Sequence, residues 1–226
     1  MKLIEEMNFR GKKYVFKNRE EAGLFLARRL KRYTNKNIMI LAIPSGGIPI
    51  GRIIAEELKA NFELIIARKI QFPDNPEAGF GAVSFDGEKV LNQALIKRAC
   101  LTEEIVKEQI RVTKEEIKRR MKVFGTKRLP ELKGKIVIIT DDGLASGYTM
   151  LAAIKSVKKH KPRKLIVAVP TGNSEAIRLI GKEVDEIYCL NIRNELIFAV
   201  ADAYKEWYDL SDEEVIEWLK RRKLSF

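Results

Sequence analysis

The sequence is poor in the residues that build zinc centres and disulfide frameworks. Its 226 residues include two cysteines and a single histidine. Cys100 and Cys189 lie far apart, and neither belongs to a CxxC pair, so the chain cannot assemble a zinc site of the usual cysteine and histidine type. We expect two reduced, partly buried thiols. His160 stands in a basic run that closes an expected helix, which leaves no role for histidine catalysis.

Long apolar stretches are missing as well. The longest uninterrupted apolar run covers residues 38–43, far short of the roughly 20 residues that span a bilayer. The first residues include Glu5 and Glu6, where a secretory signal would need an apolar stretch. These two observations predict a cytoplasmic protein without a membrane anchor.

Positive charge, by contrast, is in excess. The chain has 43 lysines and arginines against 31 aspartates and glutamates, which gives a net charge of +12. Such a surplus suits nucleic acids, acidic lipids or phosphorylated small molecules. The basic residues interleave with acids, as in residues 114–120, and no helix-turn-helix, RNP-like or zinc-finger pattern occurs. We therefore expect the charge to serve phosphate handling and solvation, with no specific nucleic-acid partner.

Apolar strands alternate with amphipathic helices along the chain. A hydrophobic content of 46% and a charged content of 33% exclude wholesale disorder. The apolar runs predict strands at residues 38–43, 62–67, 136–140, 165–169 and 186–190. The helical periodicities predict helices at residues 19–33, 48–60, 102–124, 148–159, 175–181 and 211–223.

This order of elements predicts an α/β fold, with a mainly parallel twisted sheet and helices on both of its faces. The length suits a single domain over residues 1–226. Its core is expected at about residues 19–190, and a small hood and a C-terminal helix at about residues 191–226. In such sheets, ligands bind beyond the carboxyl ends of the strands.

The segment between the second strand and the long helix is expected to be irregular. Residues 68–80 contain Pro73, Pro76 and Gly79, and they are predicted to form a mobile loop. Residues 82–85 and 89–92 are predicted to form a hairpin around an Asp-Gly turn.

The strongest functional signal is the segment from Ile136 to Thr149. A buried strand delivers two adjacent carboxylates, Asp141 and Asp142, to its carboxyl end, and a turn of small residues then opens into a helix. The N–H groups of such a turn and the helix dipole suit one phosphate group, to which the hydroxyls of Ser146 and Thr149 can add donors. The acids can accept hydrogen bonds from vicinal sugar hydroxyls, or organise Mg²⁺. A phosphate cup beside a diol clamp indicates a ribose 5-phosphate group.

A simpler interpretation is that the acid pair only caps a turn, because acids often follow strands. That interpretation leaves unexplained the coincidence of the buried strand, the spacing to Ser146 and Gly147, and the following helix. The segment fits neither a GxxxxGK[ST] phosphate loop nor a GxGxxG dinucleotide turn.

This segment resembles the signature by which type I phosphoribosyltransferases bind 5-phosphoribosyl 1-pyrophosphate (PRPP), with Ser146 where threonine is commoner. Further similarity to a poorly characterised branch of predicted phosphoribosyltransferases covers most of the chain, at residues 43–51, 68–69, 76–82, 198–200, 204 and 208–215. The resemblance implies transfer of the ribose 5-phosphate group of PRPP to an unidentified small-molecule acceptor, with release of pyrophosphate. It also implies a homodimer.

The resemblance assigns roles to residues by position. The expected catalytic residues are Asp141, Asp142 and Lys69. The expected PRPP-binding residues are Ser45, Gly46, Gly47, Arg68, Lys69, Asp141, Asp142, Gly143, Leu144, Ala145, Ser146, Gly147, Tyr148 and Thr149. Among these, residues 45–47 would grip pyrophosphate, and residues 71–81 match a mobile loop that closes over the site. Mg²⁺ would be held through PRPP, with Asp141 or Asp142 reaching it through water, rather than in a dedicated metal site.

Two departures from the family pattern bear on this assignment. The branch usually carries arginine at the position of Ser45, so that Arg68 and Lys69 would have to supply positive charge to the loop. Because the chain has 43 basic residues, Arg68 and Lys69 could equally be ordinary surface cations. Branches that act on 6-oxopurines carry an aspartate three residues after the acid pair. Here that position is Ala145, which disfavours hypoxanthine and guanine as acceptors.

The acceptor and the reaction type stay open at this stage. Residues 191–208 would form the hood over the acceptor. They include Phe198, Trp207 and Tyr208, whose rings either stack on a ligand or pack in the core. One alternative to the transferase is a non-catalytic sensor of PRPP or nucleotides on the same fold. The other is a phosphoribohydrolase or phosphorylase-type activity, in which water or phosphate is the nucleophile.

Overall fold

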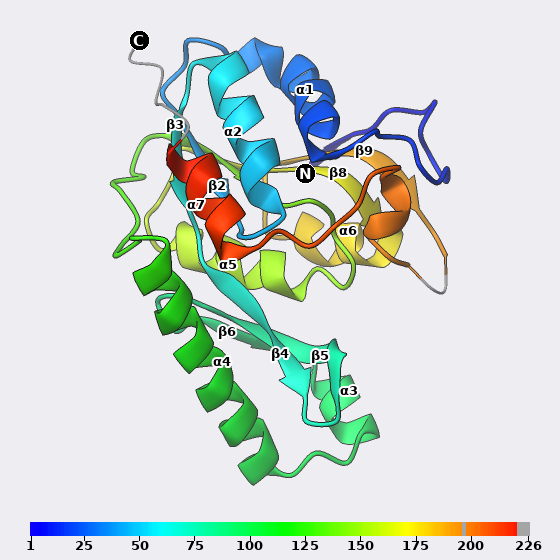
Figure 1. Cartoon of the computed structure of the whole chain (residues 1–226), viewed down its shortest axis with the longest axis vertical. Coiled ribbons are helices and arrows are strands. Elements are labelled where there is room, and N and C mark those ends of the chain that lie inside the picture. Colours follow the sequence, from blue (N-terminus) through cyan, green and yellow to red (C-terminus); the bar gives the residue numbers. More distant parts are fainter. Residues whose placement is uncertain (196–197, 221–226) are drawn as a thin grey trace.

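A parallel six-stranded sheet forms the larger part of the molecule (Figure 1). The computed structural model describes residues 1–195 and 198–220. The sheet has the order β1-β9-β8-β7-β2-β3, and all its neighbouring strands run parallel. Its strands are β1 (Lys2–Ile4), β2 (Ile38–Ala42), β3 (Asn61–Leu64), β7 (Ile136–Thr140), β8 (Lys164–Asn173) and β9 (Glu186–Arg193).

Helices cover both faces of this sheet, because successive strand residues point to opposite sides and both sides are apolar. In β2, Ile38 and Ile40 belong to the core that packs against α1 and α2, whereas Met39 and Leu41 belong to the core that packs against α5 and α6. The predicted α/β fold is therefore confirmed. The helices are α1 (Arg19–Leu30), α2 (Gly47–Leu58), α3 (Gln93–Arg98), α4 (Glu103–Val123), α5 (Tyr148–Lys158), α6 (Ser174–Gly181) and α7 (Asp212–Lys220).

A second, antiparallel sheet lies below the first in Figure 1, flanked by α3 and α4. It consists of β4 (Ala67–Phe72), β5 (Asn75–Ser84) and β6 (Lys89–Leu91). The predicted hairpin corresponds to β5 and β6. The predicted mobile loop at residues 68–80 is wrong, because most of these residues form the β4–β5 hairpin. Its apolar side chains explain the difference, since Ile70 and Phe80 are fully buried and the Phe72 ring lies 5.4 Å from that of Phe80.

Most of the other predicted elements are present with small shifts at their ends. The helix predicted at residues 19–33 ends earlier and continues as a 3-10 turn, Lys31–Tyr33. Thr102 caps α4 as expected, since its side chain accepts a hydrogen bond from Ile105 N–H. The strand predicted at residues 62–67 divides between β3 and β4, and the short elements β1 and α3 were not predicted. Residues 221–223 of the predicted last helix lie outside the described residues.

The structure also tests the expectations about cysteines and membrane spans. Cys189 is buried and Cys100 is exposed, and both are free thiols, so the expectation of partial burial is wrong for Cys100. In the described part of the chain, no helix combines the length and the apolar character that crossing a membrane requires.

The strand order directs attention to the carboxyl ends of β2 and β7. From β2 the chain moves outward to β3, whereas from β7 it moves in the opposite direction, to β8 and β9. Ligands of open α/β sheets bind at such a reversal, where the two neighbouring loops diverge. The glycine loop after β2 and the acid pair after β7 both lie there.

Candidate active site

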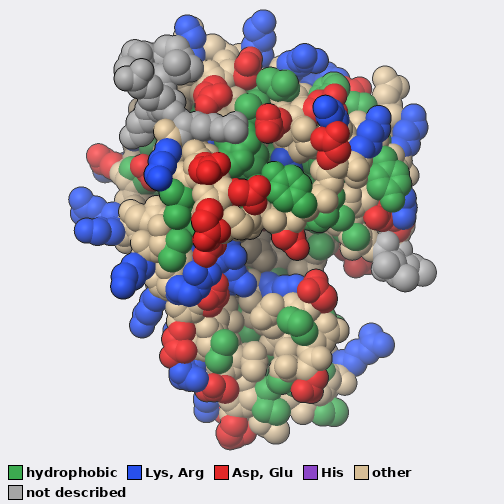
Figure 2. All heavy atoms as spheres, in the orientation of Figure 1, with side chains coloured by type: hydrophobic (Ala, Val, Ile, Leu, Met, Phe, Trp, Pro, Cys, Tyr) green, Lys and Arg blue, Asp and Glu red, His purple; other side chains and the backbone are tan. Residues whose placement is uncertain are grey.

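A pocket of about 490 Å³ opens at the carboxyl ends of β2 and β7. It is bordered by the loop between β2 and α2, by the first turns of α1 and α5, by β4 and α4, and by the segment before α7. Figure 2 shows the molecule hollowed between its larger part and the small sheet, with lysine and arginine side chains gathered at the mouth. The predicted site residues that line the pocket are Ser45, Gly46, Arg68, Lys69, Asp141, Asp142 and Thr149.

One wall of the pocket is the acid pair, held in place by Arg19. Asp141 and Asp142 follow the last residue of β7 and are half-buried. Arg19 Nε donates a hydrogen bond of 3.1 Å to Asp142 Oδ2, and Arg19 Nη2 lies 3.1 Å from the same oxygen. Tyr204 Oη donates to the backbone oxygen of Asp142 at 2.7 Å. The orientation of Asp142 is therefore fixed by α1 and by the C-terminal segment.

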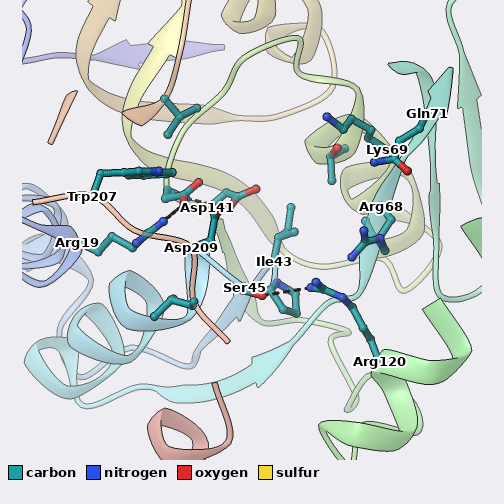
Figure 3. Close-up of a pocket in the computed structure, with 17 residues that line it drawn as sticks. Arg19, Ile43, Ser45, Arg68, Lys69, Gln71, Arg120, Asp141, Trp207 and Asp209 are labelled. Carbon is teal, nitrogen blue, oxygen red and sulfur yellow. Dashed lines mark hydrogen bonds and ion pairs between the residues drawn. The ribbon is translucent and has the colours of Figure 1, made fainter. Parts of the chain in front are cut away.

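Arg19 is itself fixed from two sides. Its guanidinium lies against the Trp207 ring (Figure 3), 3.9 Å from the ring centre. Nη1 donates to the backbone oxygen of Tyr208 at 2.9 Å. The side chain is only 8% exposed. Of the three hood aromatics, Trp207 lines the pocket, whereas Phe198 lies against Arg193 and Tyr208 is 55% exposed.

The acid pair is under electrostatic strain in the free protein. Asp141 Oδ1 accepts a hydrogen bond of 2.8 Å from Asp142 N–H. Removal from water, and then the neighbouring Asp142 carboxylate, raise the pKa of Asp141 well above its usual range. Arg19 opposes the effect of burial at Asp142 but does not cancel it, so the pKa of that carboxyl is raised too. The ionised pair is therefore suited to meet donors or a cation brought by a ligand.

Replacing Asp141 with asparagine is expected to stabilise the free protein at neutral pH. A raised pKa means that the folded state holds the proton more tightly than the unfolded state, so the ionised carboxyl lowers the free energy of unfolding once the pH passes its ordinary value. We expect Asp141→Asn to raise Tm at pH 7.5 by roughly 2–4 °C, which corresponds to about 1 kcal/mol in a chain of this size.

Differential scanning calorimetry at pH 7.5 and pH 4 checks this prediction. The gain should shrink at pH 4, because the wild-type carboxyl is then closer to its protonated form. Asp74→Asn, at an exposed position of the β4–β5 turn, is the matched control and should leave Tm unchanged. A lower Tm for Asp141→Asn at pH 7.5 would contradict the assignment of strain to this carboxyl.

The glycine loop after β2 lies directly against the acid pair. A Cβ built on Gly46 would stand 1.7 Å from Asp142 Oδ2, and one on Gly47 would stand 2.8 Å from the backbone oxygen of Thr140. Only glycine permits this approach. In the part of the chain that the structure describes, the N–H groups of Ser45 and Gly46 donate to no other residue. They are therefore available to a bound anion.

The opposite wall of the pocket carries three cations, which we call the cation cluster: Arg68 and Lys69 from β4, and Arg120 from α4. Arg120 Nη1 donates to Ser45 Oγ at 3.2 Å, drawn as a dashed line in Figure 3. Glu116 Oε1 lies 3.3 Å from Arg120 Nε and 3.6 Å from Arg68 Nη1. Lys69 Nζ donates to the backbone oxygen of Glu77.

The cation cluster holds more positive charge than its surroundings neutralise. Burial lowers the pKa of Arg68, and Arg120 adds to this effect. Burial also lowers the pKa of Lys69. Crowded, partly desolvated cations of one sign are typical of sites that receive an anion.

The turn between β7 and α5 was predicted to cradle a phosphate. Of its residues, Gly143 to Tyr148 do not line the pocket described above, and Ala145 and Ser146 are exposed beside it. Leu144 N–H donates to the backbone oxygen of Thr171 at 3.0 Å. Within residues 1–195 and 198–220, no acceptor takes the N–H groups of Ala145 or Ser146. Gly147 has the left-handed backbone, with φ of 79°, that lets α5 begin there.

Sequence reasoning missed two arginines of this pocket. Arg19 reaches an acid 123 positions away, and Arg120 reaches a hydroxyl 75 positions away. Neither stands in a motif, and only the fold brings them to the site. The absence of arginine at Ser45 was a signal that the loop's cation must come from elsewhere, but it did not identify α4 as the source.

The family model named "Phosphoribosyl transferase domain" matches residues 17–205 of the chain. "Putative phosphoribosyl transferase Rv0571c" of Mycobacterium tuberculosis is 34% identical over 214 residues, which cover 94% of this chain and 48% of that protein. The chain thus spans about half the length of this curated relative. A uracil phosphoribosyltransferase of Aquifex aeolicus is 40% identical over 60 residues, which cover 26% of this chain and 29% of that protein.

Solved structures show the same architecture. The crystal structure of TT1426 from Thermus thermophilus has a TM-score of 0.71 and 27% sequence identity, over 90% of this chain and 97% of that chain. The structure of AQ2163 from Aquifex aeolicus has a TM-score of 0.52 and 20% identity, over 82% of this chain and 76% of that chain, and supports the fold alone.

Proposed function

Because this chain belongs to the phosphoribosyl transferase family, we propose that it transfers the ribose 5-phosphate group of PRPP to a small-molecule acceptor and releases pyrophosphate. The observation that carries the proposal is that carboxylates line one wall of the pocket and cations line the opposite wall. A strained acid pair faces the cation cluster, and the glycine loop lies between them. PRPP has the matching arrangement, with a hydroxyl-bearing sugar between two phosphorylated ends.

Each wall then has a defined task. Asp141 and Asp142 accept hydrogen bonds from the two ribose hydroxyls, since ionised carboxylates act only as acceptors. The free N–H groups of Ser45 and Gly46 and the cation cluster bind the pyrophosphate group. The free N–H groups of the β7–α5 turn, at the N-terminus of α5, bind the 5-phosphate.

The residues of the pocket also fit Mg²⁺ delivered by the substrate. Among the described residues, no group of three or more histidine, cysteine, aspartate or glutamate side chains could hold a metal by itself. Mg²⁺ typically keeps several waters and binds one or two carboxylates together with substrate phosphates. Asp141 would be its protein contact, because Asp142 is already engaged by Arg19. When bound, the ion would neutralise charge on the pyrophosphate.

Catalysis at this site would rest on stabilising the leaving group. As the bond between the sugar C1 and pyrophosphate breaks, negative charge gathers on the pyrophosphate, and the ring gains oxocarbenium character. Cations and N–H groups already in position stabilise that charge without reorganising. Arg68, Lys69 and Arg120 would provide this stabilisation of the pyrophosphate. The carboxylates would hold the ribose in place and favour the positive charge that develops on its ring.

The acceptor would enter beside the C-terminal segment, where Val200, Trp207, Asp209 and Leu210 line the pocket. An apolar and aromatic wall with one carboxylate suits a flat acceptor that carries an N–H group.

Pyrophosphate release from PRPP tests this function. The assay contains protein, PRPP and Mg²⁺, with a panel of pyrimidines, purines and small amines offered one at a time. We expect release that depends on one acceptor class and yields the matching ribose 5-phosphate adduct. Equal release without any acceptor would indicate a hydrolase, and PRPP binding without release would indicate a sensor. Absence of both binding and release would overturn the proposal.

A further inference from the structure

The amino ends of the parallel strands form a surface at the opposite end of the sheet from the pocket, which lies at the carboxyl ends. Because the strands are parallel, the segments that precede β2, β7, β8 and β9 lie next to one another at a single edge. Backbone hydrogen bonds connect them: Ile136 N–H donates to Asn37 O at 3.0 Å, and Arg163 N–H donates to Lys135 O at 2.8 Å. We call this edge, at residues 34–37, 133–135, 158–164 and 182–185, the amino-end surface.

Two neighbouring cavities hollow this surface, and each has three basic residues among the eight that line it. One has a volume of about 600 Å³ and the other about 350 Å³, and Asp185 lines both. Together they hold two acids, Glu183 and Asp185, and six basic residues: Lys36, Lys158, Lys161, Arg163, Lys164 and Lys182. Lys158, Lys161, Arg163 and Lys164 come from one basic run of the sequence, and the topology brings Lys36 and Lys182 beside it.

Four of the six cations form no ion pair within the described residues. Lys158 pairs with Glu183 and Lys164 pairs with Glu186, each at 2.7 Å. Lys36, Lys161, Arg163 and Lys182 are exposed and form no ion pair with any part of residues 1–195 or 198–220, although Lys36 Nζ lies 5.4 Å from the centre of the Tyr33 ring. A row of unpaired cations over a hollow surface suits a partner that carries regularly spaced negative charges.

We propose that the amino-end surface binds the phosphate backbone of nucleic acids without sequence specificity. Three strand spacings of about 4.8 Å make this edge roughly 14 Å wide. Duplex DNA carries one charge per about 1.7 Å of its axis, so several phosphates fall within that width. The exposed large hydrophobic side chains of the described residues lie outside these four segments. A lipid surface, which takes up exposed apolar side chains, is therefore the poorer match.

Fluorescence anisotropy with a labelled 20-base-pair DNA duplex, and with a single-stranded RNA of the same length, tests the proposal. The test variant combines Lys36→Gln, Lys161→Gln, Arg163→Gln and Lys182→Gln. The control variant combines Lys107→Gln, Lys114→Gln, Lys118→Gln and Lys122→Gln. These control residues are exposed cations of α4, so that both variants lose the same charge.

At 50 mM salt we expect the test variant to bind at least 10-fold more weakly than the wild type, and the control variant to stay within about twofold. Raising the salt to 200 mM should weaken wild-type binding to the duplex about 150-fold, since each of four phosphate contacts adds about −0.9 to the slope of log K against log salt concentration. Different duplex sequences should bind alike. If the fourfold variant does not fold, the pairs Lys36→Gln with Lys161→Gln, and Arg163→Gln with Lys182→Gln, replace it.

Three results would overturn the proposal. The wild type could fail to bind nucleic acid at 50 mM salt. Both variants could lose binding equally, which would mean that net charge alone is responsible. Finally, anionic lipid vesicles could bind at this surface while nucleic acid does not. Because none of the four test residues lines the pocket at the carboxyl ends, these results are independent of PRPP turnover.

Discussion

Replacing Gly46 with alanine is expected to lower kcat/KM for pyrophosphate release from PRPP by about 100-fold or more. The added methyl group would stand 1.7 Å from Asp142 Oδ2, so either the glycine loop or the acid pair must shift. A displacement of about 1 Å in a catalytic arrangement costs on the order of 100-fold in rate. Steady-state measurement of pyrophosphate release gives this ratio directly.

A double-mutant cycle separates this steric effect from general damage to the fold. Overpacking of this kind lowers the free energy of unfolding by about 1–3 kcal/mol. In an Asp142→Ala background the carboxylate is gone, so Gly46→Ala should cost much less there. Denaturant unfolding of the four proteins checks this. An equal cost in both backgrounds would show that the loop does not depend on contact with Asp142.

Replacing Arg120 with alanine is expected to raise the Kd for inorganic pyrophosphate and the KM for PRPP. Arg120 contacts Ser45 Oγ at 3.2 Å and brings to the glycine loop a cation that the loop itself lacks. A charge-assisted hydrogen bond contributes about 1.5–3 kcal/mol, so each constant should rise roughly 10- to 150-fold. Titration calorimetry with pyrophosphate and steady-state kinetics with PRPP measure the two constants.

Two further variants make this prediction specific. Arg111→Ala removes an arginine from the same helix, one that is exposed and pairs with Glu108 and Glu115; it should leave both constants unchanged. Ser45→Arg in the Arg120→Ala background returns a cation to the loop and should recover part of the lost pyrophosphate affinity. An unchanged Kd for pyrophosphate in Arg120→Ala would refute the role of α4 in this site.

The features that could be predicted from the sequence are those that depend on a pattern of consecutive residues. An apolar run followed by Asp141 and Asp142 is recognisable locally, because a strand that is buried on both faces has a continuous apolar pattern. The α/β order of elements follows from the same kind of signal. The sequence alone therefore places both the glycine loop and the acid pair at the carboxyl ends of strands.

The features that were missed depend on packing between distant segments. Arg19, Arg120 and the β4–β5 hairpin are examples. Pro73, Pro76 and Gly79 suggested a loop, but burial of Ile70 and Phe80 outweighs their local preference. The basic run at residues 158–164 can be read from the sequence, whereas its proximity to Lys36 and Lys182 follows only from the strand order of the parallel sheet.

The most direct test of the proposed site is the binding of PRPP at equilibrium. Isothermal titration of PRPP with Mg²⁺ into the wild-type protein should give one site per chain, from which inorganic pyrophosphate displaces the ligand. Asp141→Asn and Asp142→Asn should each weaken binding by roughly 10- to 150-fold, the contribution of a charge-assisted hydrogen bond. Absence of PRPP binding, or an affinity unchanged in both variants, would contradict the assignment of this pocket.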